Sequence, residues 1–389
     1  MPIAGLVAWL FLTWFAQGTP RKMADAPKPL WSANVVKTIG PLGTYLNPGI
    51  HVREIVRFDP PGIEFLDDNR LIVYEAEPAG ELSSRADRGG SSSYVLHTSV
   101  LDVETGKILI SKDWPLHPYN QFEWKYSIRV TTGGVLVRTG DILRVCSREF
   151  AELREWPLSH SDASEGWLIT TSPSRKTVLL NHYTRSQSQF AVVNGETFRV
   201  EKSWSDSPAP LELYSISDDQ RIALRSANLG FSTSQFGTGD WRSTSLGPDK
   251  PCPTQPWFVA ADSFVYGCDR EFFWATSGGS VLMTDRFRKG EKAVARDPIL
   301  LLRSPVSVAS NGNYVAINVA ETRGSVWLDT YYSAPEEVVV YDLMRHRRVL
   351  TVEITSQPKG AYGLALSPDG SKLAILEDHF VSEYSIPSD

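Results

Sequence analysis

One short unit, two apolar segments joined by a polar turn, recurs along most of the chain. Its instances are residues 62–75, 128–138, 168–180, 213–225, 257–267, 306–318 and 363–376. The apolar segments suit half-buried strands, and the Asp, Asn, Gly, Ser and Pro residues between them suit tight turns. A hairpin repeated in this way restricts the chain to an all-β fold built from one recurring unit.

The spacing of these hairpins predicts the size of the repeated unit. Successive turns, marked by Asp68, Gly133, Pro173, Asp219, Asp262, Gly312 and Asp369, lie 40 to 65 residues apart. A four-stranded blade of a β-propeller needs roughly 40–50 residues. A second hairpin follows the first, most clearly in 94–110, 190–200, 272–283 and 338–350. We therefore expect a seven-bladed β-propeller of four-stranded antiparallel blades.

Tryptophan recurs at the end of three of the second hairpins. Segments 113–116 and 155–158 both contain Trp-Pro-Leu, and Trp204 ends the next unit in the same way. Because an indole ring buries a large apolar area, we expect these tryptophans to pack between neighbouring blades.

Three further segments carry a resemblance to a known repeat. They are Ser-Val-Leu-Asp-Val-Glu-Thr-Gly-Lys (99–107), Val-Val-Tyr-Asp-Leu (339–343) and Leu-Ala-Leu-Ser-Pro-Asp-Gly-Ser-Lys-Leu-Ala (364–374). They resemble repeats of the WD40/YVTN-type β-propeller family, in a divergent, bacterial-style form. The resemblance implies a fold and not a function. Leu101 and Tyr341 stand where the family's tryptophan would be, so the hydrogen-bond network built on that tryptophan is not expected.

The two ends of the chain are expected to close the ring together. The last repeat ends with 380–386, one strand short of a complete blade, and Trp31–Ile39 is a spare strand. Pairing these two segments would remove exposed sheet edges. We therefore expect one propeller domain over 27–389. Two smaller β domains are the alternative, although the middle of the chain has no Pro/Ser-rich linker to divide them.

The N-terminal residues 1–26 are predicted to direct export. Ile3–Ala16 is almost wholly apolar, too short for a membrane span of about 20 residues but typical of a signal-peptide core. The residues before it carry no Lys or Arg, which is unusual for a signal peptide. We expect a secreted or periplasmic protein. An uncleaved N-terminal membrane anchor and a buried core segment are the alternatives.

The cysteines suggest one covalent link. Cys252 and Cys268 bracket a single predicted hairpin and are a candidate disulfide, with two buried free thiols as the alternative. No Cys-x-x-Cys pair or Cys/His cluster occurs, so no metal site and no cofactor is expected.

Two long segments between strands are candidate binding loops. They are 76–93 in the first blade and 320–337 in the sixth, and both are expected to flank one sector of one face. The second combines aromatic and charged residues of the kinds that dominate binding interfaces. Its candidate binding residues are Arg323, Trp327, Asp329, Tyr331 and Tyr332. The alternative is that these rings pack back onto the blade.

Catalytic signatures are missing, and no catalytic residue is predicted. The sequence lacks HExxH, GxSxG, Walker A and GxGxxG motifs. His117 and His160 follow the two Trp-Pro-Leu segments and are candidate binding residues if they converge on one rim. The carboxylates at positions 67, 68, 218, 219 and 369 lie in first-hairpin turns, where turn formation explains them.

Charge further limits the function. With 39 Lys and Arg against 45 Asp and Glu, the chain is mildly acidic, which argues against nucleic-acid binding. We expect a monomeric, non-enzymatic binding or protein-interaction module that meets an unknown protein or small ligand at its loop face or channel mouth. Membrane contact is expected only through an uncleaved N-terminal segment. The alternative, implied by similar propellers, is a lactonase-like hydrolase or quinoprotein-type oxidoreductase with its site at the central channel.

Overall fold

A computed structural model describes most of the predicted β-rich region. The described residues are 27–34, 62–78, 94–116, 126–158, 166–183, 187–206, 214–226, 230–235, 241–245, 256–268, 271–286, 302–325, 330–354, 362–377 and 380–388. Their regular elements are all strands. No helix in this part of the chain is long and apolar enough to cross a membrane. The predicted export segment, residues 1–26, lies outside the described residues.

The described strands form seven four-stranded antiparallel sheets. Six of them consist of four strands that are consecutive in the chain, and the seventh combines the last three strands with the first. The first strands are β2 (Ile63–Asp67), β6 (Tyr126–Val130), β10 (Gly166–Thr171), β14 (Tyr214–Ile216), β18 (Trp257–Ala260), β22 (Leu302–Val308) and β26 (Tyr362–Leu366). The second strands are β3 (Arg70–Pro78), β7 (Val135–Thr139), β11 (Thr177–Tyr183), β15 (Arg221–Ser226), β19 (Ser263–Cys268), β23 (Tyr314–Ser325) and β27 (Lys372–Glu377).

The third strands are β4 (Tyr94–Asp102), β8 (Ile142–Cys146), β12 (Ser188–Asn194), β16 (Gly230–Gln235), β20 (Glu271–Thr276), β24 (Thr330–Asp342) and β28 (Phe380–Ser385). The fourth strands are β5 (Ile108–Leu116), β9 (Glu152–Pro157), β13 (Val200–Asp206), β17 (Trp241–Ser245), β21 (Val281–Arg286), β25 (Arg347–Glu353) and, from the other end of the chain, β1 (Trp31–Asn34).

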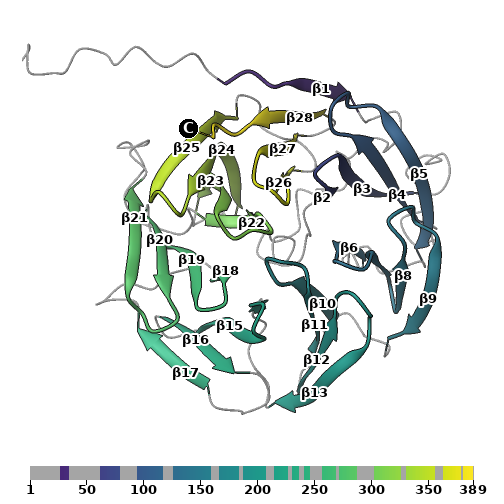
Figure 1. The fold of residues 1–389 in the computed structure, drawn as a ribbon, viewed down its shortest axis with the longest axis horizontal. Coiled ribbons are helices and arrows are strands. Elements are labelled where there is room, and N and C mark those ends of the chain that lie inside the picture. Colours follow the sequence, from purple (N-terminus) through teal and green to yellow (C-terminus); the bar gives the residue numbers. More distant parts are fainter. Residues whose placement is uncertain are drawn as a thin grey trace, which may run out of the picture.

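The sheets stand around a common centre as the blades of a β-propeller (Figure 1). We number them in chain order, so that β2–β5 form blade 1 and β26–β28 with β1 form blade 7. The first strand of each blade faces the centre and the fourth lies at the circumference. The sequence-based prediction of an all-β propeller with four-stranded antiparallel blades is therefore confirmed.

Apolar side chains hold neighbouring blades together. Separate buried clusters join blades 1 and 2, 2 and 3, 5 and 6, 6 and 7, and 7 and 1. Trp114 is 2% exposed and lies in the cluster between blades 1 and 2, and Trp156 packs on the one between blades 2 and 3. These two tryptophans pack between blades, as predicted. Trp204 stacks on Phe190 of its own blade, with 4.5 Å between ring centroids.

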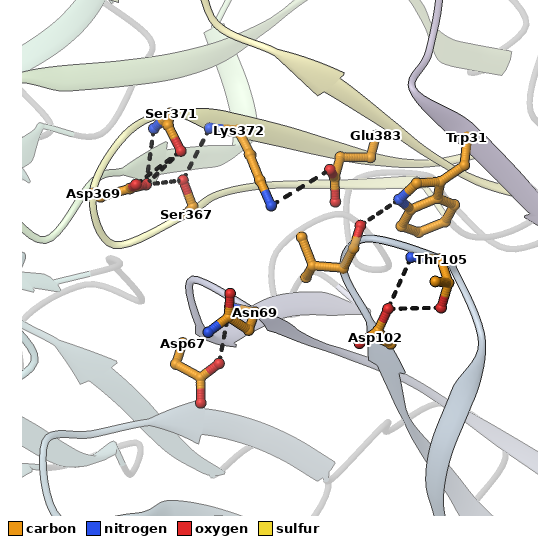
Figure 2. A network of polar contacts seen from close by, with 11 residues as sticks. Trp31, Asp67, Asn69, Asp102, Thr105, Ser367, Asp369, Ser371, Lys372 and Glu383 are labelled. Atoms are coloured by element: carbon orange, nitrogen blue, oxygen red, sulfur yellow. Dashed lines mark hydrogen bonds and ion pairs between the residues drawn. The ribbon is translucent and has the colours of Figure 1, made fainter.

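The N-terminal strand closes the ring, as the sequence predicted. β1 pairs antiparallel with β28 from Trp31↔Glu383 to Asn34↔Phe380. The Trp31 indole N–H donates a hydrogen bond to the carbonyl of Val103 in blade 1 (Figure 2). Gly106 lets the indole lie there, because a Cβ at that position would be 2.8 Å from the ring. Its φ of +68° also favours glycine. The observed strand ends at Asn34, and residues 35–39 lie outside the described residues.

The two positions that lack the WD40-type tryptophan are filled in different ways. Leu101 is fully buried in the cluster between blades 7 and 1. Tyr341 stacks on Phe272 of blade 5, with 4.2 Å between ring centroids. Its hydroxyl donates to Asp285 Oδ2 at 2.8 Å. An aliphatic residue at one position and a stacked phenol at the other therefore supply the packing between blades.

Candidate functional site

Blade 6 carries a two-stranded extension, which we call the arm: residues 320–325 of β23 and 330–335 of β24. The two strands stay paired from Tyr314↔Asp342 out to Ser325↔Thr330. β22 accompanies β23 only as far as Val319, and β25 accompanies β24 only from Glu337. Among the described strands, both edges of the arm therefore lack a partner beyond the blade.

The expectation of a loop over 320–337 was wrong for most of its length. The chain continues as strand, with a register irregularity between Val319 and Ala320 that marks where the arm leaves the blade. Threonine and tyrosine favour strands, and Thr322, Thr330, Tyr331 and Tyr332 all lie in the paired part. These strand-forming residues favour a longer hairpin in place of the expected loop.

The arm contains three of the five candidate binding residues of blade 6. Arg323 lies directly opposite Tyr332, and Tyr331 lies opposite Gly324. Trp327 and Asp329 belong to 326–329, between the two strands and outside the described residues. The pairing therefore brings Arg323 and Tyr332 to one cross-strand position.

The remaining candidates from the sequence fall outside the described residues or have unplaced side chains. His117 and His160 are outside, as are Cys252 and most of the blade-one loop, 79–93. Cys268 ends β19, opposite Glu271. The predicted disulfide thus stays a prediction.

No group of three His, Cys, Asp or Glu residues that could hold a metal ion occurs in the described part of the chain. His97 Nδ1 lies 2.6 Å from Asp113 Oδ1 across β4 and β5, on the surface of a sheet. Burial raises the pKa of the Cys146 thiol to about 11, which keeps it protonated and unreactive at neutral pH.

The turn carboxylates hold the turns together, as predicted. Asp67 accepts a hydrogen bond from the backbone N–H of Asn69, and Asp369 accepts one from that of Ser371 (Figure 2). Asp68 accepts the N–H of Asp369 at 3.0 Å and so ties blade 1 to blade 7. Asp218 ties blade 4 to blade 3 by accepting from Ser174.

A cluster of charged residues contributed by blades 1, 2 and 3 was not predicted. Glu64 lies on β2, Arg129 on β6, Arg148 in the turn after β8, and Arg175 in the turn between β10 and β11. Glu64 Oε1 accepts the backbone N–H of Val130 at 3.1 Å, which joins blades 1 and 2. The signal was present in the sequence, since Glu64 and Arg129 interrupt apolar strands. Burying an ionisable side chain in such a strand destabilises the fold unless the side chain has a charged partner or a functional role.

Burial is the main cause of the pKa shifts of Glu64 and Arg175. It raises the pKa of Glu64, and the positive charges of Arg175 and Arg129 offset only part of that rise. Burial likewise lowers the pKa of Arg175, which Glu64 partly opposes and Arg148 reinforces. The cluster is therefore a poorly solvated group of like and unlike charges close to the centre of the ring.

Comparison with known proteins identifies the fold and no more than the fold. No protein-family model matches this chain, and no curated protein matches it by sequence. A chain in the crystal structure of a mitotic checkpoint complex superimposes with a TM-score of 0.52 and 8% identity, over 96% of both chains. Raptor from Chaetomium thermophilum superimposes with a TM-score of 0.52 and 11% identity, over 96% of this chain and 30% of the Raptor chain. At such low identity these neighbours support a WD40-like propeller fold alone.

Proposed function

We propose that this chain is a non-enzymatic protein-interaction scaffold that contacts its partner through the blade-6 arm. The observation that carries the proposal is the arm itself, whose two strand edges have no partner strand among the described residues. An uncovered edge presents a row of backbone N–H and C=O groups to which another chain can add a strand. One structural neighbour is a chain from the crystal structure of a mitotic checkpoint complex, which agrees with a scaffold role.

The residues opposite each other in the arm suit this role. Arginine and tyrosine are enriched among the residues that contribute most to protein interfaces, and Arg323 and Tyr332 share one cross-strand position. We include Trp327, Asp329 and Tyr331 in the proposed contact region on the basis of the sequence.

Shortening the arm tests the proposal. In this variant residues 321–334 are replaced by an Asn-Gly turn, which suits a two-residue hairpin. We expect the thermal midpoint to stay the same, because the blade strands below Ala320 keep their partners. A partner that co-purifies with the full chain, measured by quantitative mass spectrometry, should be lost.

Point variants refine the same test. Arg323→Ala, Tyr332→Ala and Trp327→Ala should each weaken partner capture, whereas Arg154→Ala, on the outer strand β9, should not. Equal capture by the full chain and the shortened chain would contradict the proposed role of the arm. A fall in thermal midpoint that matches the loss of capture would make the arm a packing element instead.

We also propose that residues 1–26 direct export, on the basis of the apolar Ile3–Ala16 segment. Expression with this segment intact should give a mature chain that has lost the segment, measured by intact mass. A full-length chain in the membrane fraction would favour the anchored alternative, and a full-length soluble chain would contradict both.

A further inference from the structure

The turn between β10 and β11 places an arginine where equivalent turns use other residues. In four blades the fourth turn residue donates its N–H to the carbonyl of the first: Arg175 to Ser172, Gln220 to Ser217, Gly312 to Ala309 and Gly370 to Ser367. All four donors have positive φ, between 63° and 77°. Glycine adopts this conformation at the least cost. The turn itself therefore does not call for arginine at position 175.

The side chain of Arg175 also lacks a direct partner. Within the described part of the chain, its guanidinium makes no hydrogen bond and no ion pair within 4.0 Å, although Glu64, Asp67 and Asp68 are close enough to affect its charge. Arg175 is partly buried, and desolvation lowers the pKa of its guanidinium group. Buried charges are normally paired or bound to something, so this arginine lacks the anion that would explain its position.

A second arginine lies beside it. Arg148 donates to the carbonyl of Thr132, and the N–H of Thr132 donates to the carbonyl of Arg175. The Arg148 side chain is 39% exposed. Thr132 thus contacts the Arg148 side chain and the Arg175 backbone, and the two arginines, from adjacent blades, are close enough for their charges to interact.

The carboxylates nearby are already occupied. Glu64 accepts the N–H of Val130, and Asp68 accepts the N–H of Asp369. Asp67 pairs with Arg70 at 2.7 Å and also lies 4.0 Å from Arg148. Their negative charge still shapes what the two arginines can bind. It disfavours a doubly charged phosphate more than a singly charged carboxylate, which guanidinium groups bind through paired N–H···O bonds.

We propose that Arg175, together with Arg148, binds a carboxylate group on an acidic segment of a protein partner. This proposal rests on the proposed scaffold function, because the carboxylate comes from a protein. It adds a second contact site near the centre of the ring, separate from the arm.

The test uses fluorescein-labelled hexaglutamate as the probe, followed by fluorescence anisotropy at low salt with the full chain. We expect Arg175→Gly to weaken binding at least tenfold and Arg148→Ala to weaken it several-fold. Arg154→Ala, which removes an arginine that lies over the Trp156 ring on β9, is the matched control and should bind like the unmodified chain. Undiminished binding by Arg175→Gly, or an equal loss with Arg154→Ala, would overturn the proposal.

Thermal unfolding separates binding from a structural role. Glycine suits the left-handed conformation of position 175, so Arg175→Gly should keep or raise the thermal midpoint while it loses the peptide. A lowered midpoint would mean that Arg175 stabilises the fold, and would overturn the proposal. A competition experiment tests the chemical class of the ligand. At matched ionic strength and pH 7, inorganic phosphate should displace the peptide no better than acetate. Better displacement by phosphate would overturn the carboxylate assignment.

The shortened-arm variant keeps the two proposals distinguishable. It should bind hexaglutamate normally, because Arg175 and Arg148 lie in blades 2 and 3 and the arm in blade 6. Loss of partner capture with normal peptide binding supports both sites. Normal capture with peptide binding that depends on Arg175 contradicts the arm and supports this site.

Discussion

The interface that closes the ring and the interface between blades 5 and 6 both join neighbouring blades, but they differ in the polar groups that accompany their apolar packing. Between blades 5 and 6, Tyr341 stacks on Phe272. Its hydroxyl bonds to Asp285, which also accepts Arg348 Nη2 at 2.6 Å. At the closing interface an apolar cluster is bordered by Glu383, which is 1% exposed. Its nearest cation is Lys372, with Nζ 4.0 Å from Oε1 (Figure 2).

The difference lies in how completely each buried polar group is satisfied. Tyr341, Asp285 and Arg348 all have partners, whereas Glu383 Oε2 has no hydrogen-bond partner in the described structure. Burial raises the pKa of Glu383 to about 7; the charge of Asp102 adds to this rise and Lys372 only partly opposes it. The closing interface, which contains this incompletely satisfied carboxyl group, should therefore be the weaker of the two and the one that responds to pH.

The largest expected effect comes from Trp31→Ala. The indole packs on the closing cluster and donates to the Val103 carbonyl, so its loss should lower the free energy of unfolding by about 3 kcal/mol. Urea unfolding measures the change, and faster amide exchange in β28 would locate it. Trp204→Ala, far from the closing interface, is the control and should leave β28 exchange unaltered. Unchanged exchange in β28 with Trp31→Ala would contradict the assigned role of the indole.

Glu383→Gln tests the pH response of the closing interface. The pKa of Glu383 is higher in the folded chain than its ordinary value of 4.5. The contribution of this group to the free energy of unfolding is therefore fully present below about pH 4.5 and is lost as the pH rises through about 7. The free energy of unfolding of the unmodified chain should thus fall by about 2–3 kcal/mol between pH 4.5 and pH 8 because Glu383 ionises.

The neutral amide cannot ionise, so the variant should lack this component of the pH dependence. Urea midpoints at pH 5 and pH 8 measure it, with the exposed Glu104→Gln as control. The same slope in the unmodified chain and in Glu383→Gln would show that Glu383 does not set the response.

Gly106→Ala should lower the free energy of unfolding by about 2 kcal/mol. The new methyl group would meet the Trp31 ring, and position 106 has a φ that disfavours alanine. Combining it with Trp31→Ala separates the two causes, since the steric part should vanish in the double variant. Equal costs of Gly106→Ala with and without the indole would assign the whole effect to the backbone.

Tyr341→Phe should have the smallest effect and lower the free energy of unfolding by about 1 kcal/mol. Stacking on Phe272 is kept, and Asp285 keeps its ion pair with Arg348. Thermal unfolding measures the loss, and Tyr341→Ala, which removes the ring as well, should cost several times more. Similar losses in the two variants would show that the hydroxyl and not the ring holds blades 5 and 6 together.

The fold was largely predictable because it depends on local patterns. Period-two apolar segments and turn residues such as Asp67 and Asp369 specify hairpins through nearest neighbours in the chain. Ring closure was predictable from counting strands, because a spare strand at one end and a missing strand at the other can satisfy each other. The site was less predictable. The loop expected around Arg323 is instead a pair of strands, because residues 320–325 and 330–335 pair with each other despite their polar composition.

By itself, the sequence determined the repeated hairpins and the four-stranded blades, since these follow from short-range periodicity and turn chemistry. It also determined the pairing of the two chain ends, since that follows from counting strands. Only the tertiary structure decided which charged residues meet. Glu64, Arg148 and Arg175 are separated by up to 111 positions (175 − 64), and the packing of blades 1, 2 and 3 brings them together. The same closure buries Glu383 beneath Trp31. Contacts of this kind depend on how blades pack across the ring, and no local pattern encodes that packing.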